Sequence, residues 1–285
     1  MGLMGCAQNS GGGGFEGVSS SLPAVQPGSG GSPASSSTSP TTTSTAPPST
    51  SPSAPVGPTK PPAPVPRPST ASNLTVCPGS VTIPGADVSD YDPGTSWTAY
   101  KSGGSGFAFI KATEGTTYTN PIFNSDWAAS EAAGVVRGAY HFFHPGDDPT
   151  SQAELYLKTV GQFAPGDMGP MLDFEVTDNM SAAVQVSGAL TWLSLVEKAT
   201  GKIPVVYVDP SFFNALGNPA EFVRYPLFIA EYGVTCPKVP PPWSNWTFWQ
   251  KGSAVIPGLT SGGADYDIYN GSLSQMISSA MAGWL

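Results

Sequence analysis

Two carboxylates stand two positions apart inside the short apolar run GPMLDFEV, at residues 169–176. Side chains two apart on a β-strand point to the same face, with Cα atoms about 6.5–7 Å apart, so Asp173 and Glu175 can converge on one small volume. Carboxylates brought together push their pKa values apart, so one stays ionised and the other can serve as an acid. Cleavage of a glycosidic bond requires such a pair. The doublet alone leaves open a structural pairing with Lys111 or Arg137.

Other polar and aromatic residues follow short apolar runs in the same way. In each case the residue comes at the carboxyl end of a predicted strand, where barrel enzymes assemble their sites. These residues are Asp87, Lys111 and Glu114, Tyr140 and His141, Tyr207 and Asp209, Glu231 and Tyr232, and Trp249 and Gln250. The sequence therefore predicts one site built from several strand ends.

Strands alternate with helices along the chain. Apolar, β-branched or aromatic runs predict strands within residues 82–89, 106–115, 135–143, 169–176, 203–210, 225–232 and 245–250. Helical patterns cover residues 120–134, 148–163 and 179–201. Alternation of this kind predicts an α/β fold with a mostly parallel sheet, closed into a (β/α) TIM-like barrel.

The chain before this barrel has a different composition. Residues 18–76 are rich in Pro, Ser and Thr and contain almost no aromatic or branched apolar residue. Such a segment cannot bury enough apolar surface to offset its chain entropy, so we interpret it as a disordered, semi-extended linker. An SH3-type ligand is the alternative. Residues 77–285 carry nearly all the aromatic residues and are expected to form one globular domain.

The charge of the chain argues against two classes of partner. The whole chain carries a formal charge of -9, and residues 77–285 carry -10, because Lys60 and Arg67 outweigh Glu16 in the first 76 residues. Nucleic acid and anionic membrane surfaces are therefore not expected to bind by electrostatic attraction. The sequence has no stretch of about twenty apolar residues, so no transmembrane helix is predicted.

The three cysteines favour a compartment outside the cytosol. Cys77 opens the predicted domain and Cys236 lies near its end, so the two could form a disulfide, with two unpaired thiols as the alternative. Cys6 lies in LMGCAQNSGGGG, which resembles a bacterial lipobox, and residues 1–17 are expected to be a lipoprotein-type N-terminus. Five residues before Cys6 cannot hold a signal peptide, so the rest lies upstream or the resemblance is accidental.

Eight segments give a family resemblance. ADVSDYD, FAFIKATEGTTYTNPIF, GAYHFFHP, MLDFEV, PVVYVDPSFF, LFIAEYG, FWQ and ADYDIYNG occur in this order and resemble glycoside hydrolase family 25, the Chalaropsis-type lysozymes, from residue 83 to residue 273. The resemblance implies an irregular barrel of the glycosidase type. It also implies hydrolysis of the β-1,4 bond between N-acetylmuramic acid and N-acetylglucosamine in bacterial peptidoglycan.

The resemblance also implies roles for the acidic residues. Glu175 matches the proton donor, and Asp173 matches the carboxylate that assists the substrate's 2-acetamido group as internal nucleophile, with net retention. Asp87 matches the acidic residue after the first strand. Asp265 fits the late element DYDIYNG, with Asp267 as a second candidate there. No cofactor is expected, because the substrate carries its own nucleophile.

Sugar contacts follow from the same resemblance. They are expected at Tyr140, Tyr207, Tyr232 and Trp249. The strand ends and the late acidic element add candidate substrate-binding residues, namely Gln250, Lys111, Glu114, His141 and Asp267. Lys111 and Glu114 could instead pair with each other or orient Asp173. Trp249 falls on the family's WQ, although Lys251 stands where Tyr is usual. His141 could instead be a hydrogen-bonded scaffold residue under the site. Two histidines without a third convincing ligand do not predict a metal site.

Two alternative functions stay open on the sequence. One is a chitinase-like or endo-N-acetylglucosaminidase-like hydrolase, although such enzymes have a further Asp where this chain has Met171. The other is a non-catalytic peptidoglycan-binding module, although the acids Asp87, Asp173 and Glu175 are all present. We expect a monomeric enzyme at or outside a bacterial envelope that acts on peptidoglycan glycan strands. Cys6 is its candidate lipid anchor.

Overall fold

The computed structural model describes residues 72–285. The predicted lipoprotein-type N-terminus at residues 1–17, with Cys6, lies outside the described residues, and so does most of the predicted linker at residues 18–76. Within the described part of the chain, no helix is long and apolar enough to cross a membrane.

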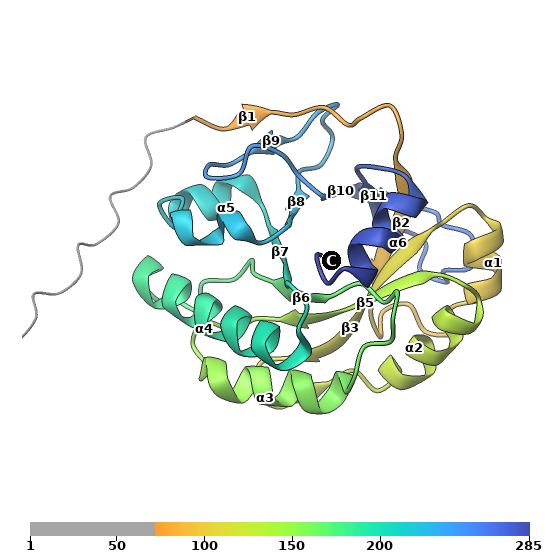
Figure 1. The fold of residues 1–285 in the computed structure, drawn as a ribbon, viewed down its shortest axis with the longest axis horizontal. Coiled ribbons are helices and arrows are strands. Elements are labelled where there is room, and N and C mark those ends of the chain that lie inside the picture. The colour runs from red at the N-terminus through yellow and green to blue at the C-terminus, as the bar shows by residue number, and fades with distance from the viewer. Residues whose placement is uncertain (1–71) are drawn as a thin grey trace, which may run out of the picture. The chain divides into compact units, whose positions relative to one another are not determined.

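Eight strands close into a barrel (Figure 1). Around the ring the order is β2, β11, β10, β8, β7, β6, β5 and β3, and β3 pairs back onto β2. The strands are β2 (Ile83–Val88), β3 (Phe107–Glu114), β5 (Val136–Phe142), β6 (Pro170–Asp173), β7 (Val205–Val208), β8 (Leu227–Ala230), β10 (Phe248–Ala254) and β11 (Ala264–Tyr269). The short β4 (Tyr118–Thr119) adds to the outer side of β3. The predicted closed barrel is confirmed.

Most neighbouring strands are parallel, as predicted, but β11 is not. It runs antiparallel to both β10 and β2. The strand prediction missed β11, because the loop at residues 255–263 returns directly to the sheet without a helix and the strand alternates aspartates with apolar residues. Its reversed direction places the start of β11 at the barrel end where the parallel strands stop.

The three predicted helices are confirmed, and two of them begin with a side-chain cap. They are α2 (Phe123–Ala132), α3 (Pro149–Val160) and α4 (Ala182–Thr200). Asp148 and Ser181 cap α3 and α4 at their N-termini, and Gly201 ends α4 in the left-handed conformation. Figure 1 shows these helices outside the barrel strands. The sequence analysis did not foresee α1 (Trp97–Ser102), α5 (Pro210–Ala215), the 3-10 helix η1 (Ala220–Arg224) or α6 (Leu273–Met281).

Aromatic rings fill the inside of the barrel toward the end where the parallel strands begin. Phe107, Phe109, Phe228 and Phe248, here called the aromatic floor, form five ring pairs with centroids 5.1 to 6.3 Å apart. Inward side chains alternate along each strand, so the next inward positions toward the carboxyl ends lie above this floor. On β3 and β10 those positions are the polar Lys111 and Gln250, which line the site at this end of the barrel.

The first residues of the domain are attached to the loop that follows β8. Cys77 and Cys236 form a disulfide, which confirms the predicted pairing. The neighbouring β1 (Leu74–Thr75) pairs antiparallel with β9 (Lys238–Val239), and Val76 N–H donates to the Pro237 carbonyl at 3.0 Å. The predicted linker therefore ends too late at residue 76, because its last residues form a strand that belongs to the folded part.

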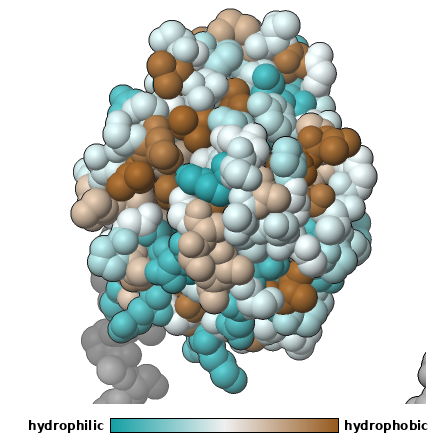
Figure 2. Space-filling view, turned by 90° about the vertical axis from the view of Figure 1, so that its right-hand side faces the viewer, coloured by the Kyte–Doolittle hydropathy of each residue, from teal (hydrophilic) through white to brown (hydrophobic). Residues whose placement is uncertain are grey.

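The surface on one side of the domain is mixed in character. On the face drawn in Figure 2, hydrophobic residues form separate patches between hydrophilic ones. That face therefore shows no single continuous apolar surface.

Candidate active site

A cavity of about 310 Å³ opens at the end of the barrel where the parallel strands stop. Most of the residues predicted from strand ends line it. They are Asp87, Lys111, Tyr140, Asp173, Glu175, Tyr207, Tyr232 and Gln250, joined by Asp265 from the start of β11. Side chains from all eight barrel strands or their ends thus meet at one place, as strand-end chemistry in a barrel requires.

Asp173 and Glu175 occupy different depths of this cavity. Asp173 is the last residue of β6 and is partly buried, whereas Glu175 lies beyond the strand and is exposed. Burial raises the pKa of Asp173 well above its ordinary value, and the nearby charge of Glu175 raises it further. The Asp173 Oδ1 atom is buried and has no hydrogen-bond partner among the described residues. Asp173 therefore lines the cavity with one of its carboxyl oxygens buried and unpaired.

Glu175 also holds its proton more tightly than an ordinary glutamate. Burial raises its pKa, and the charges of Asp265 and Asp209 act in the same direction. Lys111 opposes this shift from across the cavity. A carboxyl group at the cavity rim with a raised pKa is suited to donate a proton to a bound molecule.

Gln250 organises one wall of the cavity. It is only 3% exposed, and its amide nitrogen donates to Asp87 Oδ2 at 2.7 Å. Its carbonyl oxygen accepts a hydrogen bond from the Tyr207 hydroxyl at 2.7 Å and another from the Tyr232 hydroxyl. Gln250 therefore orients these three side chains, and the second hydrogen of its amide nitrogen has no hydrogen bond among those found in the described residues.

Asp87 lies close to its titration point at neutral pH. Burial raises the pKa of Asp87 from 3.8 to about 7, and the charge of Asp265 adds to this effect. The hydrogen bond from Gln250 acts in the opposite direction. Asp87 is therefore one of several carboxyl groups in the cavity whose pKa is raised.

Lys111 connects the cavity to a polar cluster at its edge. Its ammonium group contacts Glu114 Oε2 at 2.6 Å, and Glu114 Oε1 lies 3.2 Å from His144 Nε2. His144 also lies 3.2 Å from Asp178. Glu114 thus turns toward Lys111 and His144 and supports Lys111, whereas Lys111 itself lines the cavity. Arg137 pairs with Asp167 instead, at 2.8 Å, so it is not a partner of Asp173.

His141 and Trp249 do not line the cavity, so the sugar contacts predicted for these two residues are wrong. Both are fully buried on the outer face of the barrel. The His141 ring stacks on Trp192 of α4 and lies within hydrogen-bond distance of the Thr113 hydroxyl, 2.7 Å, which is the scaffold alternative. Trp249 donates to the Glu231 carbonyl at 2.8 Å, and the Lys251 ammonium covers its ring. Alternation along the strand could have shown this, since Tyr140 and Gln250 are the inward neighbours.

The two late aspartates are also separated by depth. Asp265 lines the cavity, and burial raises its pKa. Asp267, two residues further along β11, is fully buried below the cavity. Of these two candidates, the structure exposes Asp265 to a bound molecule.

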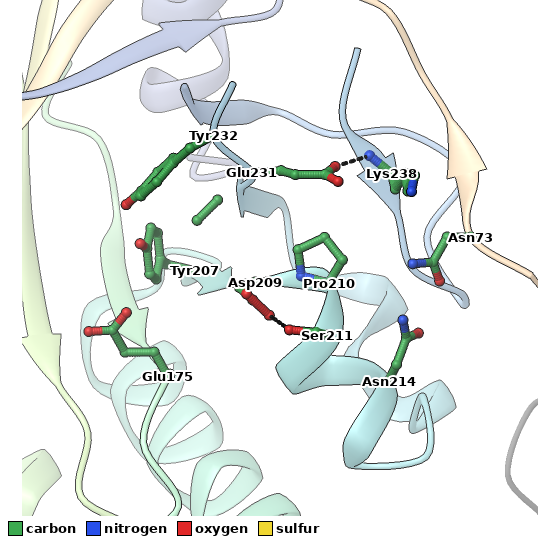
Figure 3. Close-up of a pocket in the computed structure, with 11 residues that line it drawn as sticks. Asn73, Glu175, Tyr207, Asp209, Pro210, Ser211, Asn214, Glu231, Tyr232 and Lys238 are labelled. Atoms are coloured by element: carbon green, nitrogen blue, oxygen red, sulfur yellow. Dashed lines mark hydrogen bonds between the residues drawn. The ribbon is translucent and has the colours of Figure 1, made fainter. Parts of the chain in front are cut away.

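A second hollow of about 500 Å³ adjoins the cavity. Figure 3 shows Glu175, Tyr207 and Tyr232 on one side of it and Asn73 and Lys238 on the other. Since those first three residues line both hollows, Glu175 lies between them. The sequence analysis did not name Ser211, Asn214, Asn73 and Lys238 here. The position of Asn73 depends on the disulfide and on β1. The sequence analysis did not predict the strand β1.

The described residues offer no metal centre. Among residues 72–285, no group of three or more His, Cys, Asp or Glu side chains could hold a metal ion. The chemistry that this site can do with its own groups is proton transfer and stabilisation of positive charge by carboxylates.

Comparisons with known proteins agree with this geometry. Residues 86–258 match the model of glycosyl hydrolases family 25. The N,O-diacetylmuramidase of Chalaropsis sp is 33% identical over 211 residues, which are 68% of this chain and 97% of that protein. The uncharacterized protein YegX of Escherichia coli (strain K12) is 35% identical over 204 residues, 70% of this chain and 74% of that protein. The crystal structure of the bacterial lysozyme from Streptomyces coelicolor superposes with a TM-score of 0.68 at 28% identity, covering 72% of this chain and 100% of the other.

Proposed function

Because this chain belongs to glycosyl hydrolase family 25 and is a glycoside hydrolase, we propose that it hydrolyses the β-1,4 bond between N-acetylmuramic acid and N-acetylglucosamine in bacterial peptidoglycan. The observation that carries this proposal is the position of Glu175 between two adjoining hollows, with Asp173 beside it. A polymer that occupies both hollows would place an internal linkage next to the acid. The names of the relatives, a lysozyme and an N,O-diacetylmuramidase, support the same substrate.

Glu175 is the proton donor in this proposal. Its raised pKa keeps a proton available at the cavity rim, where the glycosidic oxygen of a bound chain would lie. As the bond between the anomeric carbon and this oxygen breaks, the oxygen takes the proton from Glu175 and leaves as the hydroxyl of the next sugar. Glu175 is then a carboxylate that can accept a proton from the incoming water.

Asp173 assists the nucleophile that the substrate brings. Its buried Oδ1 has no partner among the described residues, and an acetamido N–H of the bound sugar would supply one. The carbonyl oxygen of that acetamido group would attack the anomeric carbon and form an oxazolinium-like intermediate. Water would then attack the same carbon and give net retention. The new hydrogen bond would favour the ionised form of Asp173, which burial disfavours in the free enzyme.

Asp87 and Asp265 complete the acidic wall around the reacting carbon. Both line the cavity, and Gln250 holds Asp87 in place. Carboxylates fixed beside a reaction centre stabilise the positive charge that develops on a sugar ring as the bond breaks. Tyr140, Tyr207 and Tyr232 supply aromatic surface in the same cavity.

The alternatives have less support from the site. The chitinase-like and endo-N-acetylglucosaminidase-like hydrolase would need a carboxylate two residues before Asp173, where Met171 lines the cavity. A non-catalytic wall-binding module would not need four carboxyl groups converging on one cavity. Membership in the hydrolase family also favours catalysis.

The cellular location follows from the substrate. A wall hydrolase acts outside the cytosol or in the envelope, and the Cys77–Cys236 disulfide fits an oxidising compartment. Anchoring through a lipidated Cys6 and a monomeric state remain parts of the proposal.

The experiment is a digest of purified peptidoglycan with the full chain, followed by reduction with borodeuteride and mass spectrometry of the labelled ends. A new N-acetylmuramic acid end is expected. In Glu175→Gln the rate should fall by about 10²–10⁴-fold, whereas Glu221→Gln, an exposed change in η1, should leave the rate unchanged. A new N-acetylglucosamine end would point to the glucosaminidase alternative. No new end would favour the binding module.

A further inference from the structure

Asp267 is a buried acid that the proposed mechanism does not use. Its side chain is fully buried, and neither carboxyl oxygen has a hydrogen-bond partner among the described residues. An ionised carboxylate without partners is strongly disfavoured in such a position, so the group keeps its proton. Burial raises the pKa of Asp267 well above its ordinary value, and the charges of Asp87 and Asp265 raise it further. Burial without partners and the raised pKa both favour the protonated form of Asp267, which has a hydrogen to donate.

The strand register places this acid beside Asp87. Asp267 lies opposite Gln250 on β10 and opposite Gly85 on β2. Directly opposite residues in antiparallel pairs share a face of the sheet, and Asp87 lies two residues beyond Gly85 on that same face. Gly85 has no side chain to separate them, and a Cβ there would come within 2.5 Å of the Phe107 ring. Asp267 thus lies inside the barrel, on the same face of the sheet as Gln250 and Asp87.

The neighbours of Asp267 leave Asp87 as its acceptor. The Gln250 carbonyl oxygen already accepts from two tyrosine hydroxyls. The Tyr100 hydroxyl on α1, whose pKa the charge of Asp267 raises, donates to the Phe107 carbonyl at 2.5 Å. Asp265, on the same strand, lies in the cavity above. The side chain of Asp267 also acts to lower the pKa of Asp87, against the effect of burial.

We propose that Asp267 is a positioning residue that donates its carboxyl hydrogen to the Asp87 carboxylate from inside the barrel and, with the Gln250 amide, fixes that carboxylate toward the substrate. Asp267 does not touch the substrate in this arrangement. It acts through Asp87, which it keeps ionised over a wider range of pH. This inference rests on the proposed function, because Asp87 must face a substrate for its ionisation to affect the rate.

The test compares Asp267→Asn with Asp267→Val in the full chain. Asparagine keeps a neutral donor of the same size, whereas valine fills the space without one. We measure kcat and KM on peptidoglycan across the pH range, with thermal unfolding as a check on folding. Asp267→Asn should stay within about threefold of the wild type with the same pH profile. Asp267→Val should lose about tenfold in kcat at neutral pH, and the acidic limb of its profile should move up by about one pH unit.

Two outcomes would overturn the inference. If Asp267→Asn loses as much activity as Asp267→Val, the site requires an ionised Asp267. If Asp267→Val folds and keeps the wild-type profile, Asp267 only fills space. Asp126→Asn is the matched control, because Asp126 is a buried carboxyl on α2 that accepts from Trp97 Nε1 at 3.0 Å, outside the residues that line the cavity. A wild type that forms no N-acetylmuramic acid ends would refute the proposed function, whereas the comparison of variants tests only Asp267.

Discussion

Replacing Gln250 by glutamate tests how far the cavity depends on one amide. The side chain keeps its shape, and the oxygen that accepts from the Tyr207 and Tyr232 hydroxyls is retained. The other end changes from a donor to a carboxylate oxygen that faces Asp87 Oδ2, 2.7 Å from the present nitrogen position. Two carboxylates at that distance cannot both be ionised without strong repulsion. Asp87 would therefore shift position or take up a proton.

The size of the effect follows from the hydrogen bond that is lost. A hydrogen bond to a charged group contributes about 1.5–3 kcal/mol. At about 1.4 kcal/mol per factor of ten, its loss predicts a fall in kcat/KM of roughly 10- to 150-fold at pH 7 for Gln250→Glu. The fall should shrink at lower pH, because one proton shared between Asp87 and the new carboxyl group restores a donor. Turbidity loss of a cell-wall suspension, followed from about pH 4 to pH 8, measures it.

A matched change elsewhere separates this effect from a general loss of stability. Gln185 on α4 is 4% exposed, and its amide nitrogen donates to the Met180 carbonyl at 2.7 Å, away from the residues that line the cavity. Gln185→Glu should lower the unfolding temperature without changing kcat/KM. If Gln250→Glu retains full activity, or loses the same factor at every pH, Gln250 does not act by orienting Asp87 and the reasoning fails.

Two further predictions concern stability. Because the pKa of Asp87 rises from 3.8 to about 7 on folding, the folded state binds more protons between these values, so the unfolding temperature should increase as pH falls from about 7 toward 4. Calorimetry should find a smaller increase in Asp87→Asn, and an equal increase would assign the effect to other groups. Asp167→Leu removes the buried carboxylate partner of Arg137 and leaves the guanidinium only the exposed Glu131, so it should lower the free energy of unfolding by about 3–5 kcal/mol. Urea denaturation measures this loss, and a fall in kcat/KM of the folded variant would contradict a purely structural role.

The architecture and the location of the site could be predicted from the sequence because both depend on local patterns. Alternating apolar runs and helix caps identified the parallel strands, and polar residues at the strand ends marked one end of the barrel. β11 escaped the strand prediction, since its aspartates interrupt the apolar pattern. Those aspartates face the inside of the barrel, where the cavity and the space below it accommodate them.

The face of the strand to which each side chain points was harder to predict from the sequence. His141 and Trp249 stand next to cavity residues in the sequence but point to the opposite face of their strands. In the family motif WQ, Trp249 points to the outer face of the barrel and Gln250 points into the cavity. Gln250 belongs to a hydrogen-bond network with partners on β2, on β7 and after β8, and no spacing in the sequence contains that network. Asn73 reaches the second hollow only because distant segments pair there.

The Cys77–Cys236 disulfide also determines how a mechanical force would travel through the domain. A pull on the chain before Leu74 meets the β1–β9 pair first, because both strands lie on the outer side of the covalent link. That pair is only two residues long on each strand, so it can peel apart while the disulfide transfers the load to the loop after β8 and spares β2. Asn73 and Lys238 would separate under this tension, which would widen the second hollow before any barrel strand is disturbed. The width of the second hollow would then depend on the tension in the chain before Leu74.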